Sequence, residues 1–178
     1  MVMHVSPEAR GDECGALLAF IEEQRGGIRR SLLGLTDEQA SATPSASSLS
    51  LVGIAKHVAE VEEGWIALAG GPRPQVERTQ EAYLDGFRLL EGESVKSVLA
   101  YWEDVARRTE EFFRAAPGLD DTFPLPDEPW FPDGQEVSLR WLGLHLIRET
   151  ARHAGHADIV RESLDGKTAF ELVALAHQ

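Results

Sequence analysis

Four side chains that could bind a metal ion recur along one stretch of the sequence: His145, Glu149, His153 and His156. Successive residues of an α-helix turn by about 100°, so a helix here would gather these side chains into a sector of about 80°. Val160 falls in the same sector, which is therefore an apolar stripe and not a solvent-facing side. A buried polar group is costly unless it is paired, and a divalent metal is a good partner for neutral imidazole and carboxylate. The pattern indicates a metal site.

A third ligand has to come from another helix, and His57 is the candidate. The apolar stripe of a predicted helix from about residue 51 to residue 69 has His57 at its edge, while Lys56 and Glu63 point to the opposite side. His57 could then meet Glu149 and His153, which are one helical turn apart. Two nitrogen ligands, one oxygen ligand and an open position are typical of a catalytic zinc site. A metal in such a site lowers the pKa of a bound water or thiol.

The same three residues also allow a reading without metal. A buried histidine such as His57 is more often a hydrogen-bonded core residue than a ligand. Glu149 and His153, four residues apart, are also compatible with a hydrogen bond that stabilises the helix. The alternative is thus a buried polar network.

Three neighbouring residues could assist the ligands without binding the metal. His145 and His156 could orient a ligand or move a proton. Arg152 borders the same sector and could steer an anionic substrate, or it could be an exposed arginine in a salt bridge. The sequence leaves these roles open.

The elements that must position these residues are helices, recognised by apolar side chains at spacings of three, four and seven. Pro117 to Glu136 is a long connection with five prolines, and no stretch reads as a convincing strand. We therefore expect an all-α four-helix bundle with one long crossover loop. The predicted long helices span residues 12–33, 51–69, 94–116 and 138–164, with a capped turn at 36–39 and a short helix around 80–90.

Composition limits the class of protein. A chain of 178 residues with 43% hydrophobic residues fits a single domain, residues 1–178, with one core. A net charge of −13 argues against binding to nucleic acid or to an anionic membrane surface. One cysteine excludes an internal disulfide, and neither a signal peptide nor a run of about 20 apolar residues is visible. The expected location is the cytoplasm.

The predicted last helix also resembles a known family. Residues 148–162, RETARHAGHADIVRE, are similar to the last-helix motif of the DinB-like superfamily, and most similar to its actinobacterial "mini-circle protein" branch. Residues 51–65, which carry His57, and residues 35–39 extend the resemblance over nearly the whole chain. The resemblance implies a four-helix bundle with a divalent metal, zinc or nickel, on His57, Glu149 and His153.

The resemblance also suggests an activity. Glutamate at position 149 is similar to the mycothiol-dependent maleylpyruvate isomerase, and relatives include thiol S-transferases that use mycothiol or bacillithiol. The isomerase has a further C-terminal domain, whereas this sequence ends at Gln178, so we do not expect isomerase activity. His156 stands where related motifs have glutamine. The superfamily also makes a homodimer plausible.

The leading hypothesis is a metal-dependent thiol S-transferase that activates a thiolate for attack on a small electrophile. Zinc is the expected metal, and mycothiol is the expected thiol. One alternative is a hydrolase whose metal activates water, and another is a metal-binding stress or structural module without catalysis.

Overall fold

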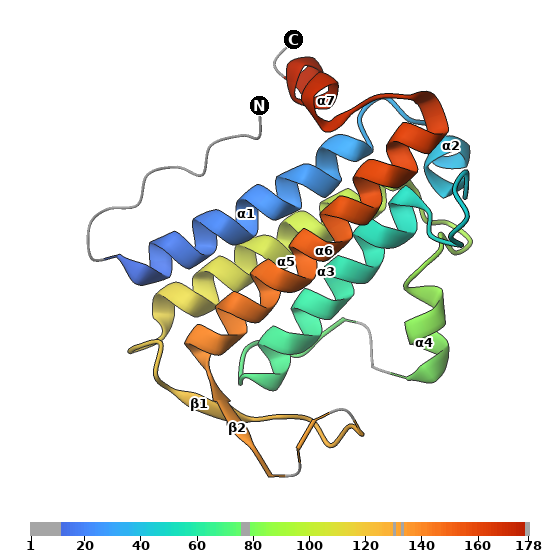
Figure 1. The fold of residues 1–178 in the computed structure, drawn as a ribbon. Coiled ribbons are helices and arrows are strands. Elements are labelled where there is room, and N and C mark those ends of the chain that lie inside the picture. Colours follow the sequence, from blue (N-terminus) through green and yellow to red (C-terminus); the bar gives the residue numbers. More distant parts are fainter. Residues whose placement is uncertain (1–11, 76–78, 130, 133, 177–178) are drawn as a thin grey trace.

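Four long helices lie side by side and make up most of the structure, which confirms the all-α bundle (Figure 1). The computed structural model describes residues 12–75, 79–129, 131–132 and 134–176. The long helices are α1 (Glu13–Ser31), α3 (Leu51–Leu68), α5 (Val95–Ala115) and α6 (Leu139–Asp165). Three short helices accompany them: α2 (Asp37–Ser41), α4 (Gln80–Asp85) and α7 (Ala169–Ala176).

The helices begin where polar caps are available. Ser50, Ser94 and Ser138 each accept a hydrogen bond from a backbone N–H in the first turn of α3, α5 and α6. Thr36 and Gln39 form the predicted capping box at the start of α2. These local hydrogen bonds explain why the predicted helix starts agree closely with the structure.

The packing places α6 between α1 and α3, and α3 between α6 and α5. The buried apolar side chains form two clusters, one near each end of the bundle. One cluster includes Ile28, Ile54, Trp102 and Val160, and the other includes Ile21, Trp65, Phe113 and Leu142. Between the clusters along the four helices lie the buried polar residues Arg25, Glu62, Thr109 and His153.

The connection from α5 to α6 corrects one expectation, because it contains two strands. β1 (Thr122–Pro124) pairs antiparallel with β2 (Glu136–Ser138), and Phe123 lies opposite Val137. Each strand has only three residues, which is too short to show an alternating pattern in the sequence. Phe123 is buried in the cluster at that end of the bundle, so the hairpin closes this end (Figure 1).

Two further details differ from the expectations. Phe20, which the spacing places on the buried side of α1, is 45% exposed. The helix α7 was not predicted; it packs against α1 through the buried Leu172. Within the described residues, no helix has both the length and the apolar character needed to cross a membrane.

Candidate metal centre

His57 of α3 and the pair Glu149 and His153 of α6 come together in the structure, as the sequence predicts. One possible ligand atom from each of the three lies within 4.8 Å of the other two. The Nε2 atom of His153 is 3.2 Å from Oε1 of Glu149. Both histidines are buried and Glu149 is partly exposed, so the cluster meets solvent on the side of the carboxylate.

Aromatic side chains hold the imidazole of His57. Its ring stacks on Phe87 with centroids 4.2 Å apart and meets the edge of Tyr83 at 5.9 Å. The ring of His153 lies 5.0 Å away on the other side. Phe87 follows α4, which therefore covers the site from the side of α3. Sequence reasoning missed both aromatic residues; their spacing of four within the predicted helix around residues 80–90 was the available signal.

Gly53 allows this covering segment to come close to α3. A Cβ atom at position 53 would lie 2.1 Å from the carbonyl oxygen of Phe87, which is a backbone atom and cannot rotate away. Only glycine therefore permits this approach, and Phe87 reaches His57 as a result.

The electrostatics of the cluster favour an ionised Glu149. Its hydrogen bond with His153 lowers the pKa of Glu149 to about 2, although desolvation by burial acts in the opposite direction. The nearby imidazoles of His145 and His57 lower this pKa further. The carboxylate is therefore charged at neutral pH and is able to bind a cation without first losing a proton.

Two imidazole nitrogens at the site are buried without a hydrogen-bond partner in the described part of the chain, Nδ1 of His153 and Nδ1 of His156. Buried polar atoms nearly always have a partner, so unpartnered ones call for an ion or water. The ring of His156 meets the ring of His153 edge-on, with centroids 5.4 Å apart. His156 thus lies against a ligand candidate, as predicted for an assisting residue.

The structure places His145 and Arg152 on the same side of α6, outside the three-residue cluster. His145 stacks on Trp141 with centroids 4.8 Å apart and tilts against Trp65 at 4.6 Å. Its Nδ1 lies 3.1 Å from the guanidinium of Arg148. Arg152 is exposed, and within the described residues it forms no salt bridge. The reading of Arg152 as a salt-bridging arginine is therefore not supported.

The opposite side of α3 carries a buried ion pair that sequence reasoning missed. The carboxylate of Glu62, 1% exposed, accepts hydrogen bonds from Nε and Nη2 of Arg25 on α1. It also accepts hydrogen bonds from Oγ1 of Thr109 at 2.6 Å and Nε1 of Trp102 at 3.3 Å, both on α5. Glu62 thereby joins α3 to α1 and α5.

Lys56 and Glu63 do lie away from His57, as predicted, but both are buried. Lys56 pairs with Glu93 at 2.7 Å, and Glu63 accepts hydrogen bonds from Tyr101 and Arg108. Charged residues are rarely buried unless they are paired, and these partners satisfy that condition. Polar contacts thus join α3 to its neighbours at Lys56, Glu62 and Glu63.

The three candidate ligands fit a divalent metal. With metal–ligand distances of about 2.0–2.1 Å, two ligand atoms of a tetrahedral site are about 3.3 Å apart. The 3.2 Å between His153 and Glu149 is close to that value, and the outer limit of 4.8 Å requires only a small movement of His57. The donor set of two imidazoles and one carboxylate is one that zinc accepts.

Comparison with known proteins identifies the family. A sequence profile described as mycothiol S-transferase matches residues 16–166, from the first turn of α1 to the end of α6. The chain belongs to the mycothiol S-transferase family. This confirms the part of the resemblance that concerns mycothiol S-transferases, whereas the "mini-circle protein" branch stays a prediction.

A solved structure gives a second comparison for this mycothiol S-transferase family member. It is described as a conserved protein from Enterococcus faecalis, with a TM-score of 0.61 and 14% sequence identity. The match covers 87% of this chain and 98% of that chain. At this identity the likeness concerns the fold alone. No protein with curated annotation matches the chain significantly.

Proposed function

We propose that this protein is a metal-dependent thiol S-transferase that joins mycothiol to a small electrophile. The family match supports the thiol. The proposal depends most on the approach of His57, Glu149 and His153, whose ligand atoms lie within 4.8 Å of one another across two helices. Three side chains leave a fourth position for a substrate atom, as in catalytic zinc sites. Zinc is the proposed metal, and nickel is the second choice.

The metal, when bound, supplies one effect: it lowers the pKa of a thiol, so that a thiolate is present at neutral pH. The chain's own residues provide the rest. Ionised Glu149 offsets part of the positive charge, and Phe87 holds the ring of His57 in place. We assign to His156 the role of accepting the proton that the thiol loses, because its ring contacts that of His153 and its Nδ1 has no hydrogen-bond partner among the described residues.

The transfer step is a nucleophilic substitution. The thiol loses its proton, its sulfur forms a bond to the electrophilic carbon, and the leaving group departs with the electron pair of the broken bond. With chlorodinitrobenzene as the electrophile, the sulfur–carbon bond replaces the carbon–chlorine bond and chloride leaves. No oxidant or reductant is consumed.

The first test is the metal content of the purified protein, measured by mass spectrometry without chelators or affinity histidines. We expect about one zinc or nickel ion per chain in the wild type and a loss of metal in His57→Ala and His153→Ala. The matched control is His145→Ala, which removes an imidazole from the same side of α6 but outside the cluster, and it should keep its metal. A wild type that neither contains nor takes up zinc or nickel would contradict the proposal.

The second test measures conjugation of mycothiol with chlorodinitrobenzene by the metal-loaded protein. Formation of the thioether should require both the metal and the thiol, and Glu149→Gln should strongly reduce it. Hydrolysis of test esters at equal rates with and without thiol would instead indicate that the metal activates water.

A further inference from the structure

Two arginines of α6, Arg148 and Arg152, have no carboxylate partner within the described part of the chain. Both are exposed and are one helical turn apart. The recorded contact of Arg148 is with Nδ1 of His145 at 3.1 Å. Seven other arginines on the long helices pair with carboxylates: Arg25, Arg29, Arg107, Arg108, Arg114, Arg140 and Arg161.

A shortage of acidic residues does not explain the unpaired arginines. The chain has 30 aspartates and glutamates against 17 lysines and arginines. Two like charges four residues apart on a helix also repel each other and disfavour the helix. Placing both arginines on one side of α6 without a partner therefore has a cost in stability, and an anionic ligand is a physical reason for that cost.

The two arginines lie on the solvent side of the α6 flank that carries the candidate metal ligands. One flank of α6 meets α1, where Gly143 lies against Leu17. The other flank meets α3 through His145 and His153. At about 100° per residue, Arg152 falls about 20° and Arg148 about 60° beyond His145, on the solvent side of this second flank. Glu149, the partly exposed ligand candidate, lies between them in sequence.

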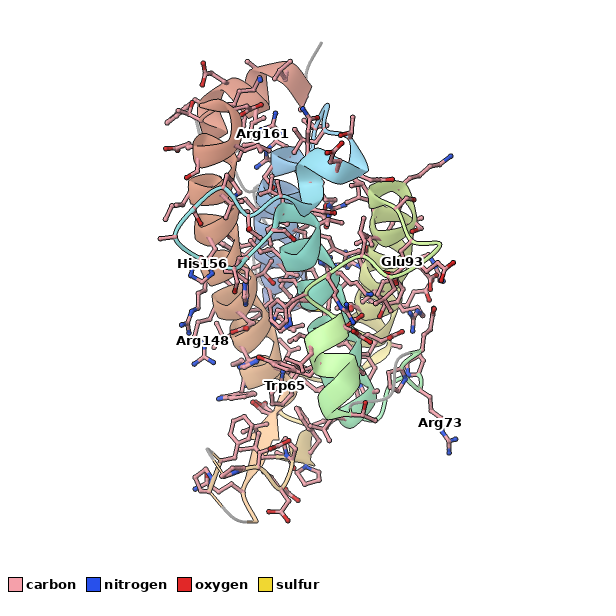
Figure 2. The ribbon with its side chains drawn as sticks, turned by 90° about the vertical axis from the view of Figure 1, so that its right-hand side faces the viewer. Trp65, Arg73, Glu93, Arg148, His156 and Arg161 are labelled. Atoms are coloured by element: carbon pink, nitrogen blue, oxygen red, sulfur yellow. The ribbon has the colours of Figure 1, made fainter. Side chains whose placement is uncertain are left out.

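Figure 2 shows Arg148 and the outer edge of α6 with α4 in front. Arg148 and His156 are labelled along one edge of α6, and Trp65 lies between α6 and the short helix α4. Arg73, another exposed arginine, projects from the far side of the molecule, away from that edge. Arg148 therefore lies on the solvent-facing edge of α6.

We propose that Arg148 and Arg152 bind a carboxylate of the small substrate whose reacting atom lies at the cluster of His57, Glu149 and His153. This rests on the proposed function and adds the substrate class, an anionic small molecule. Guanidinium groups bind carboxylates through two parallel hydrogen bonds, and two arginines one turn apart cover about 5 Å of the helix. Mycothiol, the proposed thiol, has no free carboxylate, so the carboxylate belongs to the electrophile; a carboxylate on the thiol would indicate an acidic thiol in place of mycothiol.

The test uses the full chain loaded with cobalt(II), whose absorption changes when a thiolate binds. The thiol probes are mercaptopropionate, which is anionic, and mercaptoethanol, which is neutral; succinate, titrated by calorimetry, is the probe without a thiol. The variant is Arg148→Gln with Arg152→Gln, and the matched control is Arg73→Gln. Circular dichroism and urea unfolding establish that the variants fold.

If the thiol carries the carboxylate, the double variant should bind mercaptopropionate about tenfold more weakly and mercaptoethanol as tightly as the wild type. If the electrophile carries it, the thiols should bind unchanged and succinate binding should weaken about tenfold. Arg73→Gln should behave as the wild type throughout. Unchanged binding of both mercaptopropionate and succinate by the double variant would overturn the inference.

A failure of the proposed function gives a different result from a failure of this inference. Absence of any spectral change with either thiol in the wild type would speak against thiol binding at the metal. The succinate titration would still test the two arginines, since it does not depend on a thiol.

Discussion

The buried pair of Arg25 and Glu62 is the clearest point at which one substitution should destabilise the bundle. Glu62→Gln keeps the size of the side chain and removes its charge, so it opens no cavity. Arg25, only 3% exposed, would keep a single ionic contact, with Glu22 at 3.2 Å. Removing one partner of a buried ion pair costs about 3–5 kcal/mol, because the other charge stays buried without compensation.

The structure places the expected value for Glu62→Gln near the lower end of that range. The single oxygen of glutamine is still able to accept the hydrogen bond from Trp102, and its amide N–H is able to donate to the hydroxyl oxygen of Thr109; these partners lie 3.3 and 2.6 Å from the carboxylate oxygens. We therefore expect a loss of about 3 kcal/mol in the free energy of unfolding. With a urea dependence of about 2 kcal/mol per M, the unfolding midpoint should fall by about 1.5 M.

The assay is equilibrium unfolding in urea followed by tryptophan fluorescence. Glu111→Gln, which removes one partner of the exposed pair with Arg107, should leave the midpoint unchanged and serves as the control. Adding Arg25→Met to Glu62→Gln should recover part of the loss, because the uncompensated charge is then absent. A midpoint for Glu62→Gln within 0.5 M of the wild type, about 1 kcal/mol, would refute the reasoning.

Two further predictions concern the helix α3. Burial raises the pKa of Glu60 to about 7, because the buried carboxyl group is more stable protonated than ionised. The stability that the protonated group contributes is fully present below about pH 4.5 and is lost as the pH rises through 7. At pH 8 the free energy of unfolding of Glu60→Gln should therefore exceed that of the wild type by about 1 kcal/mol, a value reduced to allow for the partial solvent exposure of Glu60. At pH 4 this difference should disappear. Urea unfolding at the two pH values measures it. Gly53→Ala should lower the free energy of unfolding by about 1–3 kcal/mol, because the added Cβ would collide with the carbonyl of Phe87. Gly155→Ala, in open space on α6, is the control and should leave this free energy unchanged or raise it. Equal urea midpoints for the two alanine variants would contradict the close approach at Gly53.

The long helices and the candidate ligands on α6 were predictable because they depend on local sequence. Helical caps such as Ser94 act within one turn, and the spacing of Glu149 and His153 places them together on any helix. His57 was predictable in part, since its place at the edge of an apolar stripe indicates a direction toward the core. That it faces α6 and not another helix depends on how the helices pack.

The features that were missed join residues far apart in the chain. Phe87 stacks on His57 from 30 positions away, and Arg25 pairs with Glu62 over a separation of 37. The three-residue strands β1 and β2 exist only because they pair with each other. No local pattern encodes such partners.

Each long helix has a buried polar residue between its contributions to the two apolar clusters, and this pattern is visible in the sequence only in retrospect. Taken alone, each looks like an interruption of an apolar stripe: Arg25, Glu62, Thr109 and His153. The sequence by itself determined the four long helices, their ends and the residue types suited to a metal. The tertiary structure decided which polar residues meet, because the rotation of each helix about its axis is set by contacts with its neighbours. Those contacts turn Glu62 toward Arg25 and His57 toward His153.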